Sequence, residues 1–312
     1  MIESKGNLTM KFKIIICLVL TIVYFLSCGE GVVTVDEKNY EPKIVVEGYL
    51  NPTHSVQVIR ITRNIPMNTD LQRLRLFIDN ADVKLIDLSR SPSTEYIFGF
   101  NQDSLYYEYT GSDLSILNGG TYRLEVHASI EGKNLSTSST TTVPDSGFRI
   151  RDDLSSDSLY FNKRENGSVK KPKIIFQRSP KTEFYAFSFV ALNASTSTFI
   201  YNHPFINDID EKDVEENLKD FKYSMDTIFN TPETEGMTTL EVESYHTFFY
   251  GWYRAVAYAG DQNYKDFFLT QSNVMEMDGN MHEPKMHFDG DGIGVFGSVI
   301  ADTLYFKILE DE

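Results

Sequence analysis

The thiol of Cys28 is the side chain whose position most clearly suggests chemistry. The chain has two cysteines, and the other, Cys17, lies in an uncharged stretch, residues 14–26, that follows Lys11 and Lys13. A basic flank, an apolar stretch of about 7–15 residues and a small residue before the cut are the layout of a secretory signal. The stretch is too short for a membrane-spanning helix, which needs about 20 residues. We therefore expect cleavage after Ser27, which leaves Cys28 as the first residue and the single thiol of the mature chain.

An unpaired thiol in an exported protein needs an explanation, because it cannot form an internal disulfide. Lipidation through a thioether supplies one. The segment Phe25-Leu26-Ser27-Cys28 resembles the bacterial lipobox, although Phe25 stands where leucine is usual. The alternative is a conventional cleavage site followed by an ordinary cysteine. We favour the lipoprotein, held on a membrane by acyl chains whose buried methylenes contribute about 0.8 kcal/mol each.

Two short motifs resemble metal sites but lack the required spacing. His282 and His287 are five residues apart with a proline between them, whereas a zinc-protease helix needs two histidines four apart on one face. The run Asp289-Gly290-Asp291-Gly292 is not followed by the late bidentate carboxylate of a calcium loop, so it predicts a turn. We expect no metal site and no cofactor.

The sequence also lacks a nucleophile elbow, a phosphate-binding loop and a paired-cysteine metal site. We therefore expect a protein that is not an enzyme. A hydrolase whose site is assembled from distant residues is the weakest of three hypotheses, and a deep acidic pocket with two facing carboxylates would support it.

The single tryptophan stands in a run of aromatic residues, 248–253, and it defines a candidate contact site. If exposed, Trp252, Tyr250 and Tyr253 would suit stacking on sugars or contact with a partner protein. Core packing is the alternative. We favour core packing for the run, because alternation in a strand buries large aromatic side chains.

The charge of the chain excludes some partners. Removing residues 1–27 takes away three lysines and one glutamate, which changes the formal net charge from −16 to −18. Such a surface repels phosphate backbones, so we expect no nucleic-acid binding. It also repels anionic lipids, so membrane attachment should depend on the lipid anchor.

The elements that must position these residues are predicted to be mostly strands. The chain has 22 Phe and 18 Tyr, which recur with β-branched residues in short alternating stretches. Regularly spaced strands predict a β-sandwich over residues 40–145, and the turn at residues 144–147 is the best domain boundary. A second β-rich domain with short helices should cover residues 146–312. Residues 28–39 are expected to be a tether behind the signal peptide, residues 1–27.

The expected elements are as follows. In the first domain, strands are predicted at 43–50, 56–63, 74–78, 81–88, 95–100, 106–109, 121–130 and 134–143. In the second, strands are predicted at 173–177, 184–192, 238–243, 251–258, 292–296 and 304–309, with helices at 208–221 and 262–270 and a loop at 155–168.

Seven segments stand out when they are taken together, at residues 43–48, 81–83, 120–126, 132–133, 142–144, 261–264 and 292–297. In this order they resemble a family of envelope lipoproteins of Bacteroidota known as domain of unknown function 4249. The resemblance implies a lipoprotein of the outer membrane, at the cell surface or on the periplasmic face. It also implies an immunoglobulin-like or transthyretin-like first domain, and it implies no catalytic residues.

The resemblance further suggests a setting among outer-membrane transporters that import nutrients. The leading hypothesis is therefore a non-enzymatic binding or accessory module of nutrient uptake that works with a TonB-dependent transporter. The second hypothesis is an adhesion or envelope-assembly protein that binds other proteins.

Overall fold

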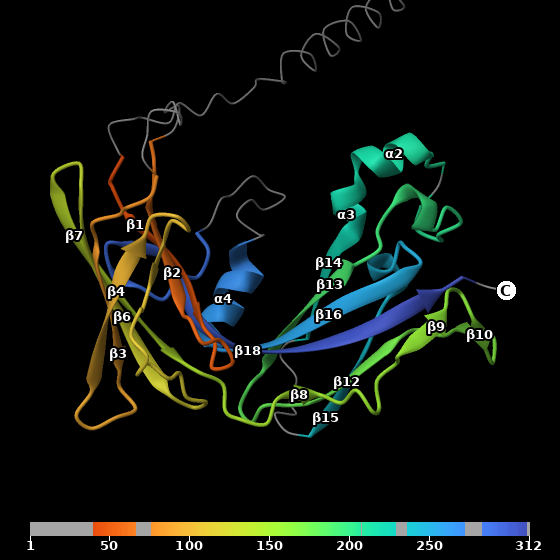
Figure 1. The fold of residues 1–312 in the computed structure, drawn as a ribbon, viewed down its shortest axis with the longest axis horizontal. Coiled ribbons are helices and arrows are strands. Elements are labelled where there is room, and N and C mark those ends of the chain that lie inside the picture. Colours follow the sequence, from red (N-terminus) through yellow and green to blue (C-terminus); the bar gives the residue numbers. More distant parts are fainter. Residues whose placement is uncertain (1–39, 67–75, 207, 229–235, 272–282, 311–312) are drawn as a thin grey trace, which may run out of the picture. The chain divides into compact units, whose positions relative to one another are not determined.

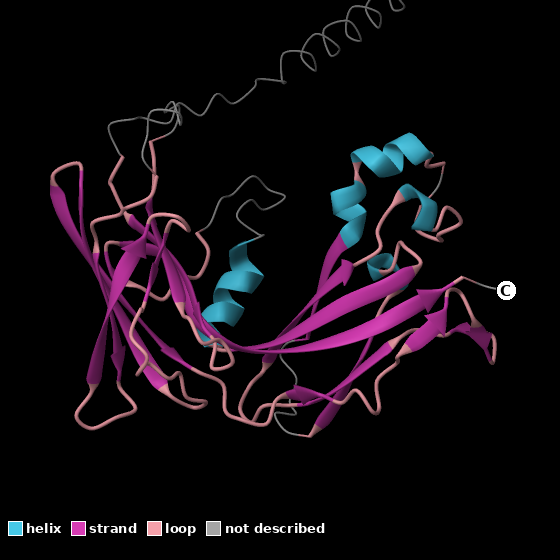
Figure 2. Cartoon of the chain, viewed as in Figure 1, coloured by secondary structure: helices cyan, strands magenta, loops and turns pink. Residues whose placement is uncertain are grey.

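The computed structural model describes residues 40–66, 76–206, 208–228, 236–271 and 283–310. Within these ranges the protein is mostly β with a few short helices, as the alternation of the sequence predicts (Figure 2). The predicted signal peptide, the tether and Cys28 lie outside the described residues.

The first group of strands surrounds one apolar core. Its strands are β1 (Ile44–Leu50), β2 (Val58–Arg63), β3 (Asp82–Asp87), β4 (Thr94–Asn101), β5 (Tyr106–Glu108), β6 (Thr121–Ile130) and β7 (Lys133–Thr142). Neighbours pair in the order β1-β2-β5-β4-β3-β6-β7, and all these pairs are antiparallel. In β6 every second residue from Tyr122 to Ile130 is buried, which is the period of a strand with one face on a core.

The last strand, β18 (Gly292–Leu309), connects this group to a second sheet (Figure 1). Its first part pairs in parallel with β1, from Gly292 to Ser298, and its second part pairs antiparallel with β16 (Gly251–Gly260) from Val299 onward. The sequence predicts two separate terminal strands here. The two halves of β18 pair with different strands, first β1 and then β16. The chain passes from one partner to the other without a turn, so the two predicted strands form one continuous strand.

This second sheet region has the order β14-β13-β16-β18, and through the β18–β1 pair it is continuous with the first group in one 13-stranded sheet within the described residues. Its remaining strands are β13 (Phe184–Ala191) and β14 (Tyr223–Ile228). One face carries Tyr185, Phe187, Phe189, Tyr253 and Phe306, all at most 1% exposed. These side chains belong to a core cluster separate from that of the first group. The predicted division after residue 145 stays a prediction.

Short elements complete the fold. They are β8 (Arg149–Ile150), β9 (Ser158–Tyr160), β10 (Arg164–Glu165), β11 (Ser168–Val169), β12 (Lys173–Gln177), β15 (Met237–Glu241), β17 (Asp289–Gly290), α2 (Glu211–Glu216), α3 (Leu218–Lys222), α4 (Gln262–Gln271) and the 3₁₀ turns η2 (Thr196–Thr198) and η3 (Ser244–His246).

Several of the observed elements differ from the sequence prediction. The helix expected over 208–221 is broken at Asn217 into α2 and α3. The loop expected over 155–168 contains β9 and the beginning of the β10–β11 hairpin. Strand β14 was not predicted.

Candidate functional site

The aromatic residues predicted to contact a ligand lie in two different environments. Tyr253 is 1% exposed; its ring stacks on Phe306 at 5.3 Å between centroids, and its hydroxyl donates to the carbonyl of Phe249. Tyr250 is partly buried against the same core. Trp252, in contrast, is 46% exposed. Alternation along β16 turns its side chain away from the core that Tyr253 enters.

The face of the sheet that carries Trp252 combines exposed aromatic side chains with two cations, Arg254 and Lys307, of which Lys307 lies directly opposite Trp252. The register places Arg254 opposite Tyr305 on β18, and Val190 opposite Tyr223 on β14, so these side chains share the face. Tyr223, Met225, Trp252 and Tyr305 are each about half exposed. An antiparallel sheet with one face on a core commonly has polar residues on its other face. We call this surface, with Tyr223, Met225, Trp252, Arg254 and Tyr305, the aromatic face.

The aromatic face continues into a cavity of about 590 Å³ beside α4. The floor comes from β16 and β18, and Tyr264 and Phe268 of α4 form one wall. The full lining is Tyr49, Asn51, Thr53, His54, Val256, Tyr258, Tyr264, Phe268, Gln271, Val299, Ala301 and Thr303. Its size lies within the roughly 300–1,000 Å³ of small-molecule sites. We call this cavity the tyrosine pocket.

The tyrosine pocket offers aromatic rings, hydroxyls, side-chain amides and the imidazole of His54. Among the described residues that line it, none is Asp, Glu, Lys or Arg. Burial raises the pKa of Tyr49 to about 12, and burial also raises the pKa values of Tyr258 and Tyr264. These hydroxyls therefore remain neutral donors and acceptors near pH 7. The rings of Tyr49 and Tyr264 meet edge to face at 5.3 Å, which fixes one corner of the pocket.

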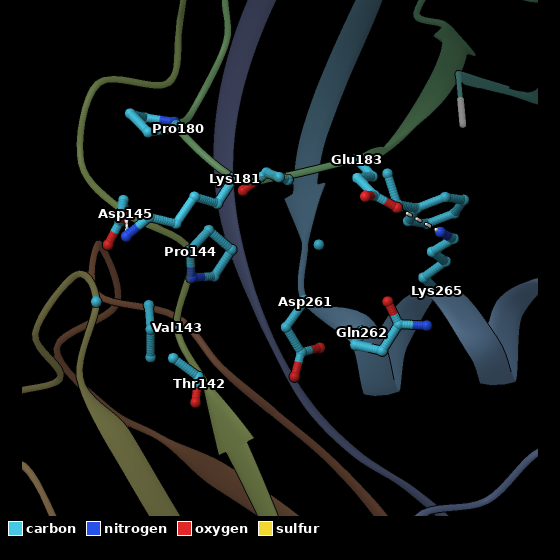
Figure 3. Close-up of a pocket in the computed structure, with 14 residues that line it drawn as sticks. Thr142, Val143, Pro144, Asp145, Pro180, Lys181, Glu183, Asp261, Gln262 and Lys265 are labelled. Carbon is cyan, nitrogen blue, oxygen red and sulfur yellow. Dashed lines mark hydrogen bonds and ion pairs between the residues drawn. The ribbon is translucent and has the colours of Figure 1, made fainter. Parts of the chain in front are cut away.

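A second cavity, of about 360 Å³, lies next to the loop that follows β7 (Figure 3). Its charged side chains are paired: Lys181 lies 3.3 Å from Asp145, and Lys265 lies 3.0 Å from Glu183. Exposed pairs of this kind contribute about 0–1 kcal/mol. The remaining carboxylate on this cavity belongs to Asp261, the residue before α4.

Hydrogen bonds give the Asp261 carboxylate a positioning role. It accepts from the backbone N–H groups of Tyr264 and Ser298, at 2.9 and 3.1 Å, and from the hydroxyl of Thr141 at 2.5 Å. Loss of surrounding water raises the pKa of this carboxyl, and the same hydrogen bonds act in the opposite direction. Asp261 therefore caps α4 and ties it to β7 and β18.

Asn263 continues this connection. Its side-chain amide donates to the carbonyls of Thr140 and Phe296, each at 2.8 Å. The segment 261–264 thus holds α4, one wall of the tyrosine pocket, against two strands that are distant in sequence. We call the contacts of Asp261 and Asn263 the α4 clamp.

The two motifs that resemble metal sites have other contacts. His287 lies 2.9 Å from a carboxylate oxygen of Asp266, while His282 lies outside the described residues. Asp291 accepts from the N–H of Ser136, and the turn predicted over residues 289–292 is reduced to a bend at Asp291, because Asp289 and Gly290 form β17 and pair with β7. Within the described part of the chain, no three His, Cys, Asp or Glu side chains gather as metal ligands would.

The family model for a domain of unknown function, DUF4249, matches residues 31–302. The chain belongs to the DUF4249 family. The match confirms the resemblance drawn from the segments between residues 43 and 297. The description of the family names no activity, and a comparison with curated proteins finds no match. No helix in the described ranges is both long and apolar enough to cross a membrane.

Two solved structures show weak similarity. One is a tetra-tandem repeat in the extending region of a large adhesion protein, at 13% identity and a TM-score of 0.22, where the match covers 83% of this chain and 49% of that one. The other is the native conformation of E. coli alpha-2-macroglobulin, at 8% identity and a TM-score of 0.18, with coverage of 84% and 16%. This chain spans about half the length of the first and under a fifth of the second. TM-scores this low do not establish a shared fold.

Sequence reasoning singled out Trp252 but favoured core packing for its aromatic run, which is right for Tyr253 and wrong for Trp252, and it missed most of the residues around Trp252. The alternation Tyr223-Ser224-Met225 is a strand signal at the end of the predicted helix, and it could have identified β14. The tyrosine pocket combines residues 49–54, 256–271 and 299–303, and no spacing in the sequence reveals that these segments meet.

Proposed function

We propose that this member of the DUF4249 family is a lipid-anchored lipoprotein of the outer membrane that acts by binding and not by catalysis. The signal layout before Cys28 supports the anchor. We further propose that it serves nutrient uptake as an accessory of a TonB-dependent transporter, exposed at the cell surface or on the periplasmic face.

The observation that carries the binding role is the aromatic face with its adjoining tyrosine pocket. Large exposed apolar patches commonly mark interaction sites. Here the patch leads into a cavity whose polar side chains are hydroxyls, amides and one imidazole, with no Asp, Glu, Lys or Arg among the described lining residues. A neutral, hydroxyl-rich molecule fits this chemistry, because a sugar ring can stack on an aromatic ring while its hydroxyls exchange hydrogen bonds with Tyr, Asn and Thr. We therefore propose a glycan fragment as the ligand class.

A glycan microarray probed with the purified protein tests this ligand class, followed by calorimetry on any glycan that binds. Tyr258→Ala should weaken binding about tenfold or more, since it removes a ring and a hydroxyl from the pocket. Tyr201→Ala, which removes an exposed tyrosine outside the pocket, is the matched control and should bind as the wild type does. Equal weakening by both variants, or no glycan binding at all, would refute the glycan proposal.

The transporter proposal needs a separate test. The native lipoprotein, carrying a C-terminal affinity tag, should co-purify with a TonB-dependent transporter after mild cross-linking of intact cells. Trp252→Ala should reduce the recovered transporter, whereas Ile97→Ala, an exposed residue on a different sheet region, should not. If the tagged lipoprotein is recovered without any transporter, this part of the proposal is wrong.

A second candidate function is an adhesion or envelope-assembly module. The part of the aromatic face outside the pocket favours it, because Tyr223, Met225, Trp252 and Tyr305 do not line the tyrosine pocket and are about half exposed. In that case Met225→Ala and Trp252→Ala should abolish capture of a protein partner other than a transporter, while Tyr258→Ala should leave it unchanged.

A further inference from the structure

A third cavity, of about 420 Å³, lies against the β10–β11 hairpin and is built differently from the tyrosine pocket. It combines an apolar wall with a basic rim. Its lining is Leu159, Tyr160, Phe161, Asn162, Arg164, Val169, Lys170, Lys171, Pro172, Pro204, Phe205, Val242, Ser244, Thr247 and Ile308. We call it the basic-rimmed pocket.

The hairpin holds the basic residues at this cavity. Arg164 pairs with Val169, and the N–H of Lys170 donates to the carbonyl of Lys163 at 2.8 Å, which extends the ladder by one step. The turn residues Asn166 and Gly167 have φ values of +52° and +85°, the left-handed conformation typical of tight hairpin turns. Arg164 and Lys170 are thus carried by a regular element.

The wall behind the hairpin is apolar and uncharged. Phe161, Val242 and Ile308 are at most 6% exposed, and the ring of Phe205 is 61% exposed. Behind Phe161 and Phe205 lies His203, whose ring contacts both at 5.3 and 5.8 Å. Burial lowers the pKa of His203, so it stays neutral, with its Nε2 2.9 Å from the carbonyl of Ser244.

The charges at the rim are positive in a chain whose net charge is −16. Arg164, Lys170 and Lys171 line the cavity, and none of the described lining residues is acidic. Lys170 has a partner in Glu165 at 3.3 Å, and Lys171 has one in Glu243 at 2.5 Å. Arg164 makes no ion pair with any described residue, so its guanidinium is available to bind an anionic ligand.

We propose that the basic-rimmed pocket binds an aliphatic carboxylate, with its head group on Arg164 and its tail along Phe161, Phe205 and Ile308. A guanidinium presents a planar fork that matches a carboxylate in two hydrogen bonds. The apolar wall removes the alkyl chain from water, and it lowers the local dielectric so that the rim charges act more strongly. This proposal is independent of the glycan site, since the two pockets share no lining residue.

Calorimetry with the purified protein and a series of carboxylates tests the proposal. From octanoate to decanoate to dodecanoate, affinity should rise about fourfold for each added methylene until the pocket is full. Dodecylammonium and dodecanol, with the same chain and no negative charge, should bind at least tenfold more weakly than dodecanoate. Equal affinity for dodecanoate and dodecylammonium would overturn the proposal.

Variants locate the site. Arg164→Gln should weaken dodecanoate about tenfold or more and leave dodecanol unchanged, because only the charged hydrogen bonds are lost. Phe205→Ala should weaken both. Arg149→Gln, which removes an exposed arginine outside the cavity, is the matched control. Both target side chains are exposed, so thermal melting should be unchanged; an effect of Arg149→Gln equal to that of Arg164→Gln would overturn the site assignment.

The carboxylate could come from a free fatty acid or from a lipid head group. Phosphatidylserine vesicles distinguish these sources, since they present carboxylates on an intact bilayer. We expect free dodecanoate to bind and the vesicles not to compete, because the wall requires an inserted tail. Direct binding of the vesicles together with no binding of free dodecanoate would overturn the proposal.

Discussion

At the scale of single residues, the proposed lipid anchor depends on one thiol. If cleavage follows Ser27, Cys28 is the only thiol of the mature chain. We predict that Cys28→Ser moves the protein from the membrane fraction to the soluble or unprocessed fraction and abolishes labelling by radioactive palmitate. Several acyl chains are needed for stable anchoring, since one chain alone is marginal.

Cys17→Ser is the matched control for this experiment. Cys17 lies in the segment expected to be removed, so this variant should be labelled and anchored like the wild type. A Cys28→Ser protein that is processed normally and stays as firmly bound to membranes as the wild type would exclude lipidation at this position.

A second residue-scale prediction concerns Asp226 on β14 and the buried ring of His246. Their closest atoms are 3.4 Å apart, and the imidazole stacks on Phe189 at 4.9 Å. The interaction with His246 lowers the pKa of the Asp226 carboxyl below its ordinary 3.8. A lowered carboxyl pKa stabilises the fold above the unfolded-state value, and this stability is lost as pH falls through the folded-state value.

We therefore predict that Asp226→Asn lowers the free energy of unfolding by on the order of 1 kcal/mol at pH 6. The difference from the wild type should shrink as the pH is lowered below about 3.8, because the wild-type carboxyl is then protonated. Urea unfolding followed by circular dichroism at several pH values measures this. Asp103→Asn, at an exposed turn, should show no such pH dependence, and a constant difference for Asp226→Asn would contradict the prediction.

At the scale of elements, the α4 clamp sets the position of the helix that walls the tyrosine pocket. Asn263 is 9% exposed and donates to one carbonyl on β7 and one on β18. We predict that Asn263→Ala destabilises the protein by roughly 2–3 kcal/mol, because two hydrogen bonds are lost where water has little access. Thermal unfolding measures the change.

Gln262→Ala is the control for the clamp, since Gln262 precedes Asn263 in the same helix and is exposed. It should change stability by no more than about 0.5 kcal/mol. If both variants cost the same, the clamp contributes nothing specific and α4 is held by its aromatic contacts alone.

The observed helices and strands also show which features of the fold can be predicted from the sequence. Strand β6 follows from a local period, and the sequence predicts both β6 and helix α4 within a residue of their observed bounds. The continuity of β18 depends on tertiary contacts: Gly294 has a φ of +107°, and a Cβ there would lie 2.2 Å from the carbonyl oxygen of Val46. A glycine in such a run suggests a break, whereas here it allows close approach to a strand about 250 residues earlier.

The same limit applies to the candidate sites. Trp252 could be singled out as a rare residue type in an aromatic run, but its exposure depends on the phase of β16, which the surrounding packing fixes. The basic-rimmed pocket was not predicted, because part of its lining lies in a segment that the sequence predicts to be a loop. Two-residue strands such as β10 and β11 are too short to show the alternation of a strand.

At the scale of the whole molecule, the net charge and the proposed lipid anchor act in opposite directions on binding to a bilayer. After cleavage at Ser27 the net charge is −18, so the protein body is repelled by anionic lipid head groups. The basic rim around Arg164 is local and small against this total. Attachment to a bilayer should therefore depend on acyl chains and be insensitive to salt.

This gives a prediction about salt for the intact protein. The native lipoprotein reconstituted with phosphatidylglycerol vesicles should co-sediment with them even in about 1 M salt, where charges are screened beyond about 3 Å. The unlipidated Cys28→Ser protein should stay in the supernatant at every salt concentration. If instead it sediments at low salt and is released at high salt, an electrostatic surface holds the protein to the membrane, and the acyl chains are not the main anchor.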